Sequence, residues 1–170
     1  MTSNTKITTL SINDWEPYKE LRLHALKDAP LAFSSSFEDA LNKVDGHWMG
    51  HLKDDKMSIS LFAKSGGKLV GMGAAIFDKK RKTRHIAELV GFYVNPDYRG
   101  QGIASKLIEE IIKRIQERPE IKKIKLSVIT TQKAGVKLYE KYDFKIAGEL
   151  RKEFALEGKY YDMYIMERIL

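Results

Sequence analysis

The sequence of 170 residues contains no cysteine. Disulfide bonds, thiolate metal ligands and a cysteine nucleophile are therefore excluded. The sequence also lacks long proline- or glycine-rich stretches and low-complexity tracts, which argues against disorder. No apolar run is long enough to span a bilayer, and residues 1–19 lack the apolar segment of a signal peptide. These absences predict a soluble protein of the cytoplasm with no membrane partner.

The chain does carry an excess of positive charge. Its formal net charge is +7, and 43% of its residues are hydrophobic, enough for a sizeable core. The densest basic run, Lys79–Arg84, lies between two strand-like segments and is typical of a solvated hairpin loop. This run has no interleaved aromatic residues, so we do not expect a stacking surface for nucleic acid. No spacing of His, Asp or Glu resembles a metal site, so no metal is expected.

Hydrophobic periodicity and turn residues divide the chain into strands and helices. Strands are expected at Lys6–Ser11, Met57–Ala63, Lys68–Phe77, His85–Val94, Ile121–Ile129, Phe144–Leu150 and Tyr160–Ile169. Four helices are expected, between Asn13 and Pro30, at Phe37–Leu52, from Gly102 to just before Pro119, and at Gln132–Tyr142. The length suits one domain covering residues 1–170. The order predicts a mixed α/β fold, with a mostly antiparallel sheet of about seven strands and one parallel pair at a β-α-β crossover.

The connection inside Val94–Leu107 joins a strand to a strongly amphipathic helix. A helix start offers unpaired backbone N–H groups and partial positive charge, so it suits a phosphate group. Gly100 and Gly102 would let the backbone approach an anion, and Arg99 adds a donor. An ordinary turn whose glycines satisfy turn geometry would look the same. The segment matches neither a nucleotide P-loop nor a dinucleotide fingerprint.

Three segments together make the pattern specific. Arg99, Gly102 and Ala104 resemble the Q/R-x-x-G-x-G/A signature of the GNAT superfamily of N-acetyltransferases. The preceding strand, Ala87–Val94, is followed by N-P-D-Y as strands of that superfamily often are. Downstream, Leu138–Phe144 reads L-Y-E-K-Y-D-F and is similar to the superfamily's L-Y-E-K-x-G-F. The resemblance covers essentially the whole chain and implies a GNAT-like fold.

The resemblance implies acetyl-CoA as co-substrate, held at its pyrophosphate by the loop amides. It implies cofactor contacts from Phe92, Tyr93, Val94, Arg99, Gly100, Gln101, Gly102, Ile103, Ala104, Ser105 and Gln132. Gln132 stands where the family often has Asn, Gly135 where it usually has Ala, and Asp143 where it usually has Gly. Gly91 would form a β-bulge that splays the two parallel strands and opens a slot, although a strand glycine can also merely relieve packing.

The resemblance also implies direct transfer of the acetyl group to an amine, without a covalent enzyme intermediate. Tyr139 is the candidate general acid for the leaving thiolate, unless it is only a core tyrosine. Glu88 is the candidate general base, unless it is a paired carboxylate outside the site. Simple alternation, if the bulge permits it, places Glu88 on the strand face of Val90, Phe92 and Val94.

The acceptor is less defined. Arg22 on the first helix is a candidate ligand for a substrate carboxylate, and Tyr160 is a candidate for lining the acceptor pocket. Both side chains have ordinary structural alternatives, as a solvated arginine and a packed strand aromatic. The expected acceptor is a primary amine of a small molecule or amino acid. The alternatives are a protein or peptide acceptor, or a non-catalytic module that binds coenzyme A or nucleic acid. A homodimer is possible, because members of the superfamily often form dimers.

Overall fold

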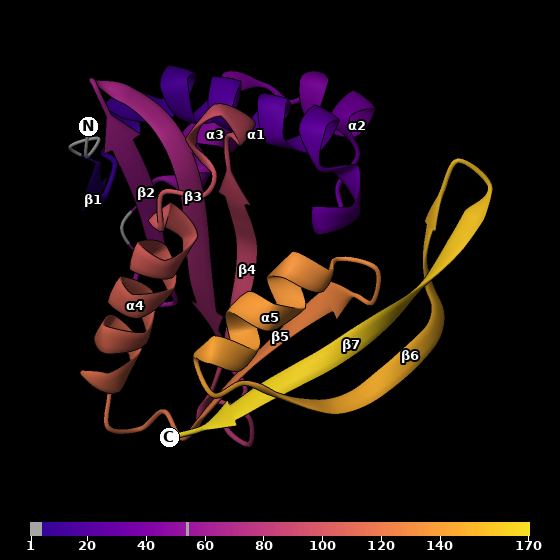
Figure 1. Ribbon diagram of the computed structural model, residues 1–170. Coiled ribbons are helices and arrows are strands. Elements are labelled where there is room, and N and C mark those ends of the chain that lie inside the picture. Colours follow the sequence, from indigo (N-terminus) through magenta and orange to yellow (C-terminus); the bar gives the residue numbers. More distant parts are fainter. Residues whose placement is uncertain (1–4, 54) are drawn as a thin grey trace.

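The computed structural model describes residues 5–53 and 55–170, and its seven strands form one sheet (Figure 1). The strands are β1 (Lys6–Thr8), β2 (Ser58–Ser65), β3 (Lys68–Phe77), β4 (Ile86–Val94), β5 (Lys123–Ile129), β6 (Lys145–Leu156) and β7 (Lys159–Ile169). Their order across the sheet is β1-β2-β3-β4-β5-β7-β6. Only β4 and β5 pair in parallel among these described strands. The predicted mixed, mostly antiparallel sheet is confirmed.

The described residues form five α-helices, one more than the sequence predicted. They are α1 (Trp15–Asp28), α2 (Phe37–Leu41), α3 (Asp45–His51), α4 (Ile103–Gln116) and α5 (Lys133–Lys141). The single helix expected at Phe37–Leu52 is wrong. The Asn42 side chain donates to the Glu38 carbonyl at 3.2 Å, and Val44 is extended with ψ 158°, so α3 has to begin anew.

Two hydrophobic cores lie on opposite faces of the sheet. The amphipathic face of α4 packs on one face, where Leu107, Ile108 and Ile111 are fully buried. On the other face α1, α2 and α3 bury a second core that includes Leu21 and Trp48. Figure 1 shows α4 and α5 in front of the strands and α1 to α3 gathered at one end. The sheet is therefore covered by helices from different parts of the chain.

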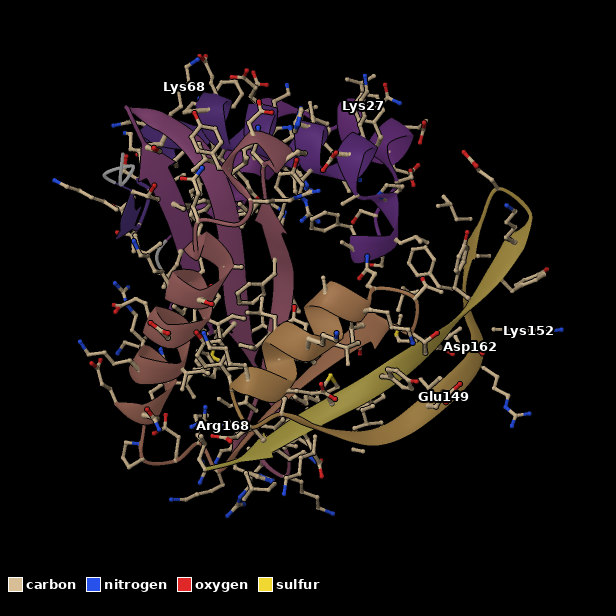
Figure 2. The ribbon with its side chains drawn as sticks, viewed as in Figure 1. Lys27, Lys68, Glu149, Lys152, Asp162 and Arg168 are labelled. Atoms are coloured by element: carbon tan, nitrogen blue, oxygen red, sulfur yellow. The ribbon has the colours of Figure 1, made fainter. Side chains whose placement is uncertain are left out.

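The last two strands are longer than expected at their turn. The strand predicted to end at Leu150 continues to Leu156, across a bulge between Leu150 and Phe154. The Asp162 carboxylate accepts a hydrogen bond from the Lys152 amide at 2.8 Å and so orders this bulge (Figure 2). The hairpin that results projects away from the rest of the sheet, as Figure 1 shows.

Candidate active site

The parallel strands β4 and β5 separate halfway along their length. Their last paired residues are Leu89 and Leu126, and beyond them the two strands diverge (Figure 1). Gly91 has φ +66°, a conformation that glycine adopts freely. At this point Gly91 and Phe92 together face Gly73 of β3, which defines a β-bulge. The expected bulge and the splayed slot are both confirmed.

The bulge changes which face of the sheet each β4 side chain meets. Leu89, Phe92 and Val94 all belong to the α4 core, whereas Tyr93 belongs to the α1 core. Glu88 precedes the bulge and lies on the face opposite Leu89. The simple alternation that grouped Glu88 with Phe92 and Val94 is therefore wrong, because one extra residue reverses the pattern.

The connection from β4 to α4 has the geometry of an anion-binding helix start. Gly100 and Gly102 both have φ +75°, and Gln101 lies exposed between them. The first intrahelical hydrogen bond of α4 runs from the Lys106 amide to the Gly102 carbonyl at 3.0 Å. Among the described residues, the amides of residues 103–105 have no hydrogen-bond acceptor. These three N–H groups can donate to a phosphate oxygen, and the helix dipole favours its negative charge.

Arg99 connects this loop to the end of α1. Its guanidinium donates to the Asp28 carboxylate at 2.5 Å and to the Val94 carbonyl at 2.9 Å. The Tyr93 hydroxyl donates to the same Asp28 oxygen at 3.2 Å. Burial and then the Asp28 charge raise the pKa of Tyr93 to about 12. Arg99 therefore fixes the strand end and the loop to α1, and only its remaining donors are available to an anion.

Tyr139 approaches the slot from α5, the helix that begins just after Gln132. Its ring meets Phe92 edge-on at 6.3 Å and Phe144 at 6.0 Å between centroids. Burial raises the pKa of Tyr139 from 10.0 to about 12. No described residue forms a hydrogen bond with its hydroxyl group. The phenol therefore holds its proton at neutral pH and has that donor free.

Glu88 forms a salt bridge with Lys125, the residue paired with it across the two parallel strands. The carboxylate and ammonium groups are 3.0 Å apart, and both side chains are partly exposed. Glu88 also lines the cavity at the slot. It is thus a paired carboxylate that also faces the site.

The slot opens into a cavity of about 1790 Å³. This volume exceeds that of a usual site for one small ligand, so it can hold two ligands side by side. From the predicted site residues it brings together Arg22, Glu88, Phe92, Tyr93, Val94, Arg99, Ala104, Gln132 and Tyr139. Ile103 is buried in the α4 core beneath the loop, and Ser105 lies in the first turn of α4. Tyr160 lies near the tip of the β6–β7 hairpin, 66% exposed and outside the cavity lining.

Several lining residues were missed from the sequence. Tyr18, His47 and His51 enter the cavity from α1 and α3, and Phe154 and Met163 enter it from the last hairpin. Their positions depend on contacts between distant segments, and no motif marks them. A spacing of four residues, Tyr18 to Arg22, was the one available signal, since it puts both side chains on one helix face.

Residues 5–53 and 55–170 contain no group of three or more His, Asp or Glu side chains suited to holding a metal ion. Within the same ranges, no helix has the length and apolar character needed to cross a membrane.

Comparison with known proteins agrees with this geometry. The profile of the acetyltransferase (GNAT) family matches residues 18–144. The L-amino acid N-acetyltransferase AaaT of Escherichia coli (strain K12) is 29% identical over 125 residues, which cover 74% of this chain and 76% of that protein. An acetyltransferase of the GNAT family from Streptococcus pneumoniae has a TM-score of 0.87 at 24% identity, covering 98% of this chain and 99% of that one.

A second solved structure shares the fold at lower identity. It is YncA, a putative acetyltransferase from Salmonella typhimurium, solved with its cofactor acetyl-CoA. The TM-score is 0.82 at 17% identity, over 98% of this chain and 94% of that one. The family profile spans well over half of the chain and includes β4, the glycine loop and Tyr139. The chain therefore belongs to the GNAT family of acetyltransferases.

Proposed function

We propose that residues 1–170 form a single N-acetyltransferase domain that moves an acetyl group from acetyl-CoA directly to a primary amine of a small molecule or amino acid. One observation carries this proposal: the slot between β4 and β5 lies beside the unpaired amides at the start of α4. A ligand with an anionic group at one end and an extended arm fits this arrangement. The relatives named above support the choice of acetyl-CoA as that ligand.

The residues around the slot fit acetyl-CoA. The amides of residues 103–105, with Gly100, Gln101 and Gly102, would hold the pyrophosphate, and Ser105 adds a hydroxyl group. The free edge of β4 at residues 92–94 offers backbone hydrogen-bonding groups to an extended arm. Gln132 lines the cavity close by and can donate through its amide. When bound, the thioester supplies the activated acetyl group.

Tyr139 is the proposed general acid. Its pKa near 12 keeps the hydroxyl protonated over the whole working range of the enzyme. The ring is held between Phe92 and Phe144, so the orientation of the hydroxyl is fixed by packing. A positioned donor of this kind contributes a rate factor of about 10² to 10⁴.

Glu88 is the proposed general base, acting on the amine of the acceptor through water. The bulge at Gly91 places Glu88 and Phe92, the neighbour of Tyr139, on opposite faces of β4. Acid and base would therefore act from the two sides of the slot. This separation suits a reaction in which the amine arrives from the α1 face and loses its proton there.

An acceptor screen tests the proposed function. Purified enzyme is mixed with acetyl-CoA and with amines, amino acids and peptides in turn, and release of free thiol is followed. We expect thiol release that depends on a small amine or amino acid and that falls in Tyr139→Phe. Thiol release with none of these acceptors would contradict the proposal.

A further inference from the structure

Arg22 is a partly buried cation without an acidic partner. It lies on α1 and lines the cavity, with its guanidinium carbon 4.2 Å from the centroid of the Phe33 ring. No described residue forms a hydrogen bond or salt bridge with it. The acidic side chains that line the same cavity, Asp39, Asp55 and Glu88, are all beyond salt-bridge distance from it.

Burying this positive charge costs free energy unless a bound anion pairs with it. Burial lowers the pKa of Arg22 from its usual value, and the nearby Tyr18 offsets this only in part. A guanidinium is never deprotonated in practice, so the site must hold a cation. Contact with an aromatic ring leaves the N–H donors, which lie in the plane of the group, free for a planar anion. A carboxylate matches that donor geometry.

The position of Arg22 limits where this anion can be. One terminal nitrogen of Arg22 lies 3.6 Å from the point that a Cβ atom on Gly91 would occupy. Gly91 is the bulge residue within the splayed part of β4. An anion bound to Arg22 is therefore held at the slot itself, on the α1 face of the sheet.

We propose that Arg22 binds the free α-carboxylate of an amino-acid acceptor. This inference rests on the proposed function, which puts the reacting amine in the same slot. In an α-amino acid, one carbon atom separates the amine from the carboxylate. An acceptor held by its carboxylate at Arg22 thus keeps its amine beside Gly91. A carboxylate many bonds from the amine would not satisfy both positions.

The surrounding charges favour the same class of acceptor. The rings of His47 and His51 on α3 meet edge to face with centroids 4.6 Å apart, and the His51 ring lies 6.2 Å from that of Tyr18. Burial, His47 and Arg22, in that order, lower the pKa of His51. Arg22 lines the cavity beside His47 and His51, and its charge opposes a further cation at this end. A polyamine would bring cations here, and a peptide N-terminus would offer Arg22 an amide instead of a carboxylate.

The test compares each common L-amino acid as free acid and as carboxamide, with acetyl-CoA saturating. We expect the best acceptor to have a kcat/KM at least 10-fold higher as the free acid. In Arg22→Met this preference should fall close to one, mainly through KM, with the affinity for acetyl-CoA unchanged. Arg114→Met removes a surface arginine paired with Glu110 outside the cavity and should keep the preference.

Three results would overturn the inference. The first is that the wild-type enzyme acetylates the free acid and the carboxamide equally well. This result can be obtained without any variant, and it leaves the proposed function intact. The second is that Arg22→Met lowers kcat/KM equally for the free acid and the carboxamide. The third is that Arg22→Met weakens the binding of acetyl-CoA. Arg22→Lys retains the charge and should keep part of the preference for the free acid. It therefore provides the test if Arg22→Met fails to fold. If no amine of any kind releases thiol, the proposed function fails and the inference falls with it.

Discussion

The ring of Phe92 meets the ring of Tyr139 at 88°, with centroids 6.3 Å apart. Phe92 occupies the space above Gly73, where a Cβ atom would lie only 2.7 Å from its ring. The bulge at Gly91 is what turns Phe92 toward this side of the sheet. Gly73, Gly91 and Phe92 therefore act together to position the proposed general acid beside the slot.

Replacing Tyr139 by phenylalanine should lower kcat by about 10² or more, because a positioned acid is lost while the ring packing is kept. The affinity for acetyl-CoA should stay within about two-fold, since the hydroxyl has no partner among the described residues. Kinetics and calorimetric titration of acetyl-CoA measure these two quantities. Tyr142→Phe is the matched control, because its hydroxyl bonds Glu109 at 2.6 Å outside the cavity. Equal losses in the two variants would remove Tyr139 from the mechanism.

The pKa of Tyr139 near 12 predicts a late ionisation. An unfolded tyrosine loses its proton near pH 10, before the folded one does, so the unfolded state binds fewer protons above that pH. The stabilising contribution of this group is therefore constant below pH 10 and declines between 10 and 12. Titration of phenolate absorbance should show two tyrosines ionising near pH 12, Tyr93 and Tyr139, and Tyr139→Phe should remove one of them. If Tyr139→Phe instead removes a transition near pH 10, burial does not raise the pKa of Tyr139.

The sequence predicted the parts of the site that are local. The stripe of isoleucines and leucines in α4 and the glycines at 100 and 102 mark a helix start within a few residues, and the resemblance placed the bulge at Gly91. The partners of Arg99 could not be predicted, because Asp28 lies 71 residues earlier in the chain. Nor could the division of Phe37–Leu52 into two helices, since the stop depends on the side-chain hydrogen bond of Asn42 and the extended backbone of Val44, which hydrophobic periodicity does not encode.

Glu88 can be separated from its salt bridge by two substitutions. If it is the general base, Glu88→Gln should lower kcat about 10²-fold and change the acidic side of the pH–rate profile. Lys125→Met breaks the same ion pair, 3.0 Å long, but keeps the carboxylate and should retain activity. If Glu88→Gln and Lys125→Met have the same kcat and the same pH–rate profile, the carboxylate serves only to pair the two strands. Partly exposed pairs contribute little stability, so both proteins should fold.

Gly135 sits inside α5 with room for a methyl group. A Cβ atom there would meet Val128 at 3.7 Å and Tyr139 at 3.9 Å, which are ordinary contacts. Gly135→Ala should therefore stabilise the protein by about 0.5–1 kcal/mol and raise the thermal midpoint by a few degrees. Gly73→Ala is the contrasting variant, because the Phe92 ring has to move, at a cost of about 1–3 kcal/mol. Thermal denaturation that ranks the two variants the other way would contradict the packing described for the slot.

The proposal on which the others depend is an acetyl-CoA site formed by the slot between β4 and β5 and the start of α4. Its most direct test is the thermal midpoint of the purified protein as acetyl-CoA is added. A ligand that binds only the folded state adds about 2.7 kcal/mol at 100 times its Kd, which for a chain of this size raises the midpoint by roughly 5–10 °C. We expect a rise of this order that grows with the logarithm of ligand concentration. An unchanged midpoint at millimolar acetyl-CoA would contradict the account.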